Sequence, residues 1–362
     1  MRCARFFATA GPRRVAMTDR GHSNGERFLV VRLTALGDIL HTVPAVAALR
    51  AAHPKAKIDW VVERKWAPVI EGSPAIDEVI PFDRRSVWNA VECVERLREN
   101  RYDCAIDFQG LYKSSILAAF SGAPRRIGFD RAWAREEGAA MFYTERVTPV
   151  GRHVSELNYS LAERAGAARP ESSEYPLRVP AGGAASVRSR LHDLGIVGEY
   201  LVIGPAASWR AKCWPPDRFG VLCRELEARA ALGAGARVVV IQGPGEKSVV
   251  DEVLRAAAPV CPAVIAPTIE ELMGLVAHAR YMVAADSGPL HLAAAMGTPV
   301  VGLYGPTDPA RNGPFTPGAV IVHKALPEEI SYKRRANYSP SMLRISVEDV
   351  LMAIDSLRKV TA

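Results

Sequence analysis

The segment from residue 281 to residue 309 constrains the fold more than any other part of the chain. Residues 281–285 are apolar and typical of a buried strand, and an Asp-Ser-Gly sequence at residues 286–288 turns the chain. Pro289 suits the first turn of a helix, where its missing N–H would be unpaired anyway. A second strand at residues 300–304 then ends in another tight turn. This succession predicts a parallel sheet whose turns meet at one edge, where such sheets bind ligands.

The predicted helix that begins at Gly288 is a candidate anion site. The first amides of a helix have no partner within the helix, and the helix dipole is positive at this end. Both properties favour a phosphate group next to the turn. The segment therefore predicts a site for a ligand that carries a diphosphate.

The rest of the chain alternates between strand and helix patterns, which is typical of parallel sheets covered by helices on both faces. Further strands are expected at residues 27–33, 57–62, 78–81, 104–108, 200–203, 237–241 and 263–265. Helices are expected at residues 37–49, 86–100, 113–121, 216–230, 245–257, 269–278 and 345–357. A stretch rich in Pro, Ser, Ala and Gly at residues 168–183 is the best linker candidate. The predicted fold class is therefore α/β, with two doubly wound domains that face a cleft.

Composition limits the function classes. A chain of 362 residues suits two domains, and none of its apolar stretches approaches the ~20 residues that span a bilayer. Six cysteines without a C-x-x-C pair indicate a reduced protein without a metal. The net charge of +7 suggests an anionic partner: a nucleotide, an acidic membrane surface or a nucleic acid. The nucleic-acid interpretation is the weakest of these, because no basic stripe is interleaved with aromatic residues.

A second strand–turn–helix pattern at residues 31–44 contains Asp38 and His41. From spacing alone, Asp38 is either an acid in the first turn of a helix, favoured by the dipole, or a carboxylate that faces the cleft. His41 fits a packed helix residue better than a metal ligand. The chain contains neither the zinc-protease, the P-loop nor the dinucleotide glycine motif.

Several motifs in order make the chain similar to glycosyltransferase family 9, the lipopolysaccharide heptosyltransferases, with a pattern most like heptosyltransferase I. The similarity runs from about residue 28 to residue 357. The stretches that carry it are LTALGDILHTVPA (33–45), DWVVE (59–63), DFQGLYKS (107–114), AREE (134–137), KCWP (212–215) and residues 286–309.

The resemblance implies a GT-B fold and an inverting, metal-independent transfer of heptose from ADP-heptose to the Kdo-lipid A inner core, without a cofactor. The domains expected from it are an N-terminal acceptor domain at 26–180 and a C-terminal nucleotide-sugar domain at 181–344. Residues 345–362 would form a helix that packs back on the N-terminal domain. Residues 1–25 are interpreted as a disordered extension or as a start codon placed too early.

The resemblance also implies roles for individual residues. Asp38 would be the general base that takes the proton of the acceptor hydroxyl, and Lys212 would neutralise the departing diphosphate. The donor-binding candidates are Asp286 for the sugar hydroxyls, the amides of Ser287, Gly288 and Leu290 for phosphate, His291, Glu246 for the ribose, and Thr268 near the adenine. The acceptor-binding candidates are the cations Lys113, Arg135, Arg84 and Arg85. For His291 a buried helix histidine bonded to a carbonyl is as good an interpretation as a phosphate contact.

The expected partners are a nucleotide sugar and an anionic glycolipid, with peripheral contact to the cytoplasmic face of the inner membrane, no nucleic acid, and a monomeric state. Two alternatives within this fold stay open: a family 9 transferase that uses another sugar or surface glycan, and a nucleotide-sugar-binding protein without catalysis. The acid at position 38 argues against the second. An oxidoreductase would need a glycine fingerprint after the first strand, and residues 33–38 contain one glycine.

Overall fold

The computed structural model describes residues 25–83, 85, 87–228 and 237–361, and it has one parallel sheet in each half of the chain. The first sheet has the order β3-β2-β1-β4-β5-β6, with every pairing parallel. Its strands are β1 (Arg27–Val31), β2 (Lys57–Glu63), β3 (Glu78–Phe82), β4 (Cys104–Asp107), β5 (Arg125–Phe129) and β6 (Glu145–Val147). Strand order reverses between β1 and β4, which is where doubly wound sheets bind ligands.

The second sheet repeats this topology with the order β12-β11-β10-β7-β8-β9, again all parallel. Its strands are β7 (Tyr200–Gly204), β8 (Arg237–Ile241), β9 (Ala263–Ile265), β10 (Met282–Ala285), β11 (Val300–Tyr304) and β12 (Ala319–His323). Here the order reverses between β7 and β10. The two halves are therefore both Rossmann-like, and the predicted α/β, GT-B fold class is confirmed.

Helices cover both faces of the N-terminal sheet because side chains alternate along each strand. Phe28 and Val30 of β1 lie in a core that includes residues of α2, whereas Leu29 and Val31 pack with residues of α4 and α5. The helices of this half are α1 (Leu36–Leu40), α2 (Val43–Ala52), α3 (Ala67–Ile70), α4 (Val87–Glu99), α5 (Tyr112–Phe120) and α6 (Val154–Arg164). Short 3-10 helices are η1 (Arg64–Trp66) and η2 (Glu137–Phe142).

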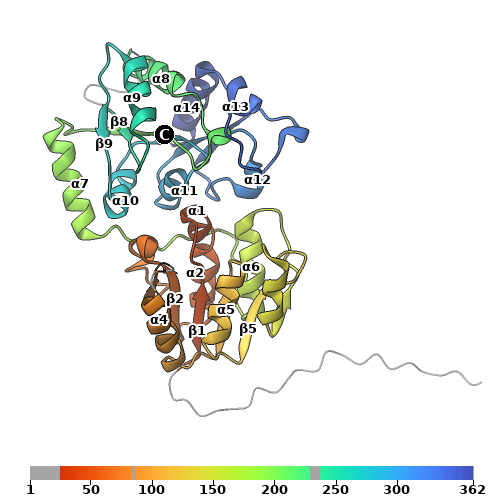
Figure 1. Ribbon diagram of the computed structural model, residues 1–362. Coiled ribbons are helices and arrows are strands. Elements are labelled where there is room, and N and C mark those ends of the chain that lie inside the picture. Colours follow the sequence, from red (N-terminus) through yellow and green to blue (C-terminus); the bar gives the residue numbers. More distant parts are fainter. Residues whose placement is uncertain (1–24, 84, 86, 229–236, 362) are drawn as a thin grey trace, which may run out of the picture.

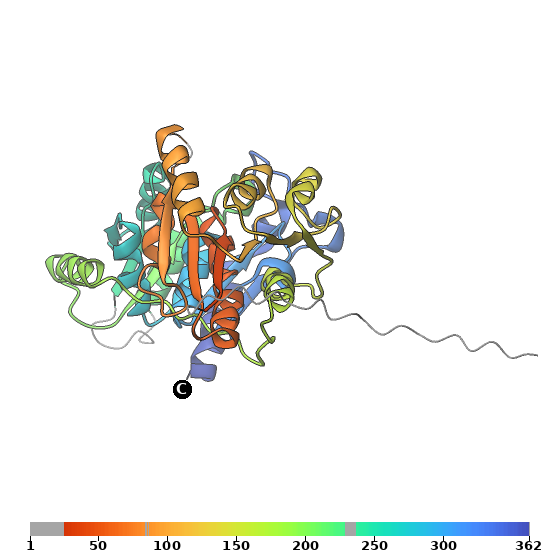
Figure 2. The same cartoon turned by 90° about the horizontal axis from the view of Figure 1, so that it is seen from below.

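The C-terminal half has eight α-helices among its described residues. They are α7 (Ala181–Asp193), α8 (Pro216–Ala228), α9 (Lys247–Ala257), α10 (Ile269–Ala277), α11 (Gly288–Ala295), α12 (Pro309–Asn312), α13 (Pro340–Arg344) and α14 (Val347–Thr361). The 3-10 helices are η3 (Arg210–Lys212) and η5 (Pro327–Glu329). Helix α7 packs against α10. In both views α7 lies at one side of the molecule (Figures 1 and 2).

The two halves are stacked one above the other, with α1 and α11 between the sheets (Figure 1). Helix α1 contacts α11, and α3 contacts α10. One apolar cluster continues across this junction and contains Val30 of the first half and Leu290 of the second. The carboxyl ends of β1 and β10 therefore face each other.

The helix expected at residues 37–49 is in fact two helices, because it is interrupted after Leu40. Pro44 lies in the first turn of α2. A proline has no N–H to donate, and its ring would clash with the carbonyl of residue 40 if one helix continued. The interruption leaves His41 and Thr42 between α1 and α2.

The closing helix differs from the expectation that residues 345–362 pack back on the N-terminal domain. Helix α14 contacts β11, β12 and α8 of the C-terminal half. Its buried residues Val350, Leu351, Ile354 and Leu357 belong to a core cluster made of C-terminal residues. The i, i+4 and i+7 spacing gives this helix an apolar face, and the C-terminal sheet is the surface that covers it.

Some predictions stay untested. The boundary at residue 180 remains a prediction, and residues 1–24 of the expected extension lie outside the described residues. Among the described residues, no helix has both the length and the apolar character needed to cross a membrane.

Candidate active site

Asp38 lies in the first turn of α1, directly after β1, and two arginines contact its carboxylate. Arg32 Nη2 is 3.0 Å from Asp38 Oδ1. Arg135 Nη2 donates to Oδ1 and to Oδ2, both at 2.9 Å. The Ala35 amide also donates to Oδ2, at 3.3 Å. Burial alone would raise the pKa of Asp38, but the charges of Arg32 and Arg135 lower that pKa to about 2. The carboxylate is therefore ionised and can act only as an acceptor.

The two arginines differ in their surroundings. Arg32 is 2% exposed, its Nη1 donates to the Phe108 carbonyl, and its own carbonyl accepts a bond from Trp60 Nε1 at 3.1 Å. Burial lowers the pKa of Arg32 to about 10. The side chain of Arg135 is 49% exposed and comes from the loop between β5 and η2. Arg32 is thus a fixed partner of Asp38, and Arg135 lies at the surface.

The turn after β4 brings the Arg135 loop close to Asp38. Gly110 has a φ of +68°, and a Cβ there would lie 3.2 Å from the Arg135 amide nitrogen. The Gly110 carbonyl accepts a bond from the Glu136 amide at 3.0 Å. Buried Asp107 holds this turn by accepting bonds from the Gln109 amide and from Tyr143 Oη, at 2.8 and 2.7 Å. A larger residue at position 110 would displace Arg135.

Asp286 is the centre of a second cluster, at the carboxyl end of β10. Lys212 Nζ lies 2.6 Å from Asp286 Oδ2, and Thr307 Oγ1 donates to the same oxygen at 2.8 Å. His291 Nε2 lies 3.2 Å from Oδ1. Burial raises the pKa of Asp286, but the bond from His291 and the charge of Lys212 outweigh it and hold that pKa below its usual range. The site is therefore an ionised carboxylate with a lysine beside it.

The start of α11 offers backbone amides next to Asp286. Ser287 is the N-cap residue, and its side chain makes no capping bond. Ser287 Oγ is buried without a hydrogen-bond partner among the described residues. Leu290 is fully buried, so only its backbone amide is a candidate ligand. Pro289 has no N–H, which leaves the amides of Ser287, Gly288 and Leu290 as the predicted phosphate contacts.

Contacts between α1 and α11 bring the Asp38 and Asp286 clusters together. A Cβ on Gly37 would lie 3.0 Å from His291 Cδ2, and a Cβ on Gly288 would lie 2.9 Å from Leu36 Cδ2. Gly37 precedes Asp38 in the chain, and His291 contacts Asp286. A possible base from one half therefore lies beside a possible diphosphate site from the other.

Three buried histidines lie at the same junction. The ring of His41 is 4.7 Å from that of His291 and 5.0 Å from that of His153. His153 Nδ1 accepts a bond from the Ser155 amide, so its Nε2 carries the proton that is donated to the Gly313 carbonyl at 2.9 Å. Burial lowers the pKa of both His41 and His153. At neutral pH these two rings are uncharged and connect the halves by packing.

Other predicted site residues have local partners. Glu246 Oε2 accepts a bond from the Gly243 amide at 2.7 Å. Thr268 caps α10, because its hydroxyl accepts from the Glu271 amide at 3.2 Å. Donor contacts from these residues stay predictions.

Three of the predicted acceptor cations follow strands of the N-terminal sheet: Arg85 follows β3, Lys113 follows β4 and Arg135 follows β5. Lys113 Nζ lies 3.9 Å from Glu63 Oε1, and Arg85 is exposed. Arg84 lies outside the described residues. Of the acceptor candidates that the structure describes, Arg135 is the one that contacts Asp38.

Sequence reasoning missed Arg32 and Thr307 as site residues. Arg32 is a cation at the end of an apolar strand, two residues before the turn, and such a position is rarely occupied by an unpaired charge. Thr307 lies in the tight turn after β11, at the sheet edge already predicted to bind ligands. Either position could have been found by asking which polar side chains lie together at the points where the strand order of each sheet reverses.

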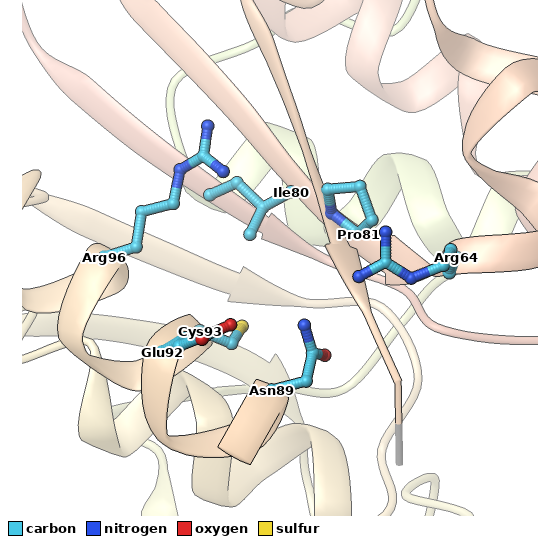
Figure 3. Close-up of a pocket in the computed structure, with 7 residues that line it drawn as sticks. All are labelled: Arg64, Ile80, Pro81, Asn89, Glu92, Cys93 and Arg96. Carbon is cyan, nitrogen blue, oxygen red and sulfur yellow. The ribbon is translucent and has the colours of Figure 1, made fainter. Parts of the chain in front are cut away.

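A separate hollow of about 270 Å³ lies at the outer edge of the N-terminal half, between β3, η1 and α4 (Figure 3). It is lined by Arg64, Ile80, Pro81, Asn89, Glu92, Cys93 and Arg96. None of the predicted site residues lines it. Within the described part of the chain, no group of three or more His, Cys, Asp or Glu side chains is arranged to hold a metal ion.

Comparison with known proteins gives a matching family and similar folds. A family model described as glycosyltransferase family 9 (heptosyltransferase) matches residues 91–341. The chain is similar to lipopolysaccharide heptosyltransferase 1 of Pseudomonas aeruginosa, with 32% identity over 87% of this chain and 88% of that protein. It is also similar to lipopolysaccharide heptosyltransferase 3 of Escherichia coli, with 27% identity over 89% of this chain and 95% of that protein.

Among solved structures, the E. coli heptosyltransferase WaaC with ADP is similar, with a TM-score of 0.72 and 28% identity over 91% of this chain and 99% of that one. The same enzyme has been solved with ADP-2-deoxy-2-fluoro heptose, with a TM-score of 0.70 and 27% identity over the same shares of the two chains.

Proposed function

Because the chain belongs to glycosyltransferase family 9, we propose that it transfers heptose from ADP-heptose to the Kdo-lipid A inner core of lipopolysaccharide, with inversion at the anomeric carbon. The observation that carries the proposal is the meeting of two clusters at the junction of the halves. Asp38 comes from the N-terminal sheet, and Lys212 and Asp286 come from the C-terminal one. A glycosyl transfer needs a base on one side of the sugar and a partner for the leaving group on the other.

On the donor side, the proposal gives the diphosphate to Lys212 and to the amides at the start of α11. Lys212 Nζ lies 2.6 Å from Asp286 Oδ2, and Asp286 directly precedes the N-cap residue of α11. The diphosphate gains negative charge as the bond to the sugar breaks, and cations placed in advance stabilise that charge. Asp286 would accept a bond from a sugar hydroxyl with its remaining acceptor position on Oδ1.

The same charges support a metal-independent reaction. In many phosphate sites a bound metal ion neutralises the leaving group, and here one lysine and a helix N-terminus would supply the positive charge. We propose that neither a metal nor a cofactor takes part.

On the acceptor side, Asp38 would accept the proton of the attacking hydroxyl. The hydroxyl oxygen attacks the anomeric carbon while the bond from this carbon to the diphosphate oxygen breaks on the opposite face, which inverts the configuration. Lys113, Arg135, Arg84 and Arg85 would bind anionic groups of the inner core. Arg135 contacts the base, and Lys113 lies in the first turn of α5, after β4.

We further propose that the protein acts as a monomer at the cytoplasmic face of the inner membrane, held by peripheral contact. The loop that carries Arg135 also exposes Trp133, at 41% of its surface, and Met141 of η2 is 70% exposed. An aromatic and an apolar side chain beside basic residues suit an acidic membrane surface. Binding to vesicles with anionic lipids, reduced in Trp133→Ser, would support this proposal, and equal binding by both proteins would contradict it.

The main alternative is transfer to a later position of the core or to another surface glycan. The resemblance to heptosyltransferase 3 covers as large a share of the chain as that to heptosyltransferase 1. A protein that binds the nucleotide sugar without catalysis is disfavoured by the placement of Asp38.

The proposal is tested by measuring ADP release from ADP-heptose with and without Kdo-bearing lipid A, for the wild type and Asp38→Ala. We expect acceptor-dependent release that is lost in the variant, with ADP binding unchanged. Release with a heptosylated core but not with Kdo-lipid A would favour the alternative. The absence of release with either acceptor would contradict heptosyl transfer.

A further inference from the structure

Arg135 contacts both carboxylate oxygens of Asp38, whose side chain is 16% exposed. Two carboxylate oxygens offer about four lone-pair positions. Arg135 Nη2 donates to both oxygens, the Ala35 amide donates to Oδ2, and Arg32 Nη2 lies 3.0 Å from Oδ1. A general base must itself contact the proton that it removes. An acceptor hydroxyl that binds either oxygen therefore competes with Arg135.

Arg135 is the partner that is able to leave. Arg32 is 2% exposed and bonded to the Phe108 carbonyl, so moving it would strand a buried charge. The Ala35 amide is part of the backbone that leads into α1. The side chain of Arg135 is 49% exposed, so its guanidinium can move without being buried unpaired.

We propose that Arg135 is a releasable counter-ion of Asp38 that is drawn away by an anionic group of the acceptor, a carboxylate or a phosphate, when the acceptor binds. This inference rests on the proposed function. Arg135 then acts as a positioning residue, because it controls access to the base. When the acceptor anion replaces the Asp38 carboxylate as its partner, the Arg135 guanidinium still makes charge-assisted hydrogen bonds.

The exchange also changes the strength of the base. With both arginines in place, the low pKa of Asp38 makes its carboxylate a weak base. Proton transfer is more efficient when the pKa of the base lies nearer the working pH. Loss of the Arg135 contact raises the pKa of Asp38, because one of the two charges that lower it is gone. Arg32 remains and keeps the carboxylate oriented.

The other titratable groups near Asp38 do not replace Arg135. His41 lies at the end of α1, and burial keeps its ring neutral by lowering its pKa. His291 of α11 lies beyond Gly37 and contacts Asp286. Asp107, at the end of β4, accepts bonds from its own turn and from Tyr143. Release of the base therefore depends on Arg135.

The test compares two enzymes with two acceptors. The enzymes are the wild type and Arg135→Gln, and the acceptors are a Kdo-bearing lipid A and the same molecule with its Kdo carboxylate esterified. A second neutralised acceptor lacks the lipid A phosphates, so that the two possible anions are distinguished. Arg131→Gln is the matched control, because Arg131 is an exposed arginine of the same loop.

We expect neutralisation of one of these anions to lower kcat of the wild type and of Arg131→Gln by about tenfold or more, which corresponds to about 1.4 kcal/mol of barrier. Arg135→Gln should show the same kcat with all acceptors, because its base is already uncovered. As the pH is lowered, kcat/KM of Arg135→Gln should begin to fall at a higher pH than kcat/KM of the wild type. A merely structural role of Arg135 would not produce this shift.

Three results would overturn the inference. A rise in KM at constant kcat for the wild type with both neutralised acceptors would mean that Arg135 only binds the acceptor. An equal fall in kcat of Arg135→Gln with every acceptor, without a shift in pH dependence, would mean that it is structural. The absence of transfer by the wild type with its anionic acceptor would reject the proposed function, and the inference with it.

Discussion

The ion pair between Lys212 and Asp286 provides the sharpest test of the donor site. The two charged atoms lie 2.6 Å apart, and the side chains are 13% and 7% exposed. In Lys212→Met the apolar part of the lysine is nearly retained and the charge is lost. Asp286 then keeps its bonds from Thr307 and His291 but loses its nearest positive charge.

The expected stability loss follows from this burial. Removing one partner of a buried pair costs about 3–5 kcal/mol when the other charge is left uncompensated. We expect Lys212→Met to lie near the lower end, at about 3 kcal/mol, because two bonds to Asp286 remain. Asp286→Asn should cost about the same or less. The double variant should be less destabilised than the sum of the two by about 1–3 kcal/mol, which is the coupling energy of a contacting pair.

Urea unfolding at neutral pH measures these free energies without a contribution from protonation of Asp286. The pKa of Asp286 is depressed in the folded state, so its stabilising contribution is complete above its unfolded value, about 3.9, and is lost as the pH falls below that value. Lys212→Met should also lower kcat by about 100-fold to 1000-fold, like a deleted oxyanion donor. Stability effects that add within about 0.5 kcal/mol would refute the argument, because they would mean that the pair is not coupled.

Three further predictions concern the junction and the donor side. The free energy of unfolding should fall as the pH drops below 6.5, the usual pKa of histidine, because the unfolded chain then binds protons that buried His41 and His153 exclude. The slope of this free energy against pH is at most about 1.4 kcal/mol per pH unit for each histidine. Urea unfolding of His41→Gln should give a smaller slope than that of the wild type. An unchanged slope would show that His41 does not titrate in this way. Gly288→Val should weaken ADP binding in calorimetry by displacing α11 from α1, whereas Ala293→Gly, farther along α11, should bind ADP as the wild type does; equal binding by both would contradict the close contact. Thr268→Ala should cost about 1 kcal/mol by loss of the helix cap, and Thr268→Ser should restore it. A rise in the KM for donor in Thr268→Ala but not in Thr268→Ser would mean that the hydroxyl, and not the methyl group, supports nucleotide binding.

The sequence was most informative where a local pattern determines the structure. Buried parallel strands read as short apolar runs, and β8, β9 and β11 have the predicted limits. The turn before Pro289 and the start of α11 follow from proline and glycine chemistry. The family motifs then supplied Asp38 and Arg135 of one cluster and Lys212, Asp286 and His291 of the other as site residues, but not Arg32 or Thr307.

Long-range pairing was not predictable from local patterns. Asp38 and Arg135 are 97 residues apart in sequence, and their contact depends on the strand order that brings the turns after β1 and β4 together. The same holds for Lys212 and Asp286, which follow the neighbouring strands β7 and β10. An apolar helix face predicts that α14 packs on some apolar surface, but it does not indicate which sheet offers that surface.

The most direct test of the central claim is the structure of the reaction product by NMR, after incubation of the protein with ADP-heptose and Kdo-bearing lipid A. The account predicts one added heptose on a hydroxyl of the Kdo residue, with an anomeric configuration opposite to that of the donor, and no such product with Asp38→Asn. Retention of the donor configuration, or equal product formation by Asp38→Asn, would contradict the assignment of Asp38 as the base of an inverting transfer.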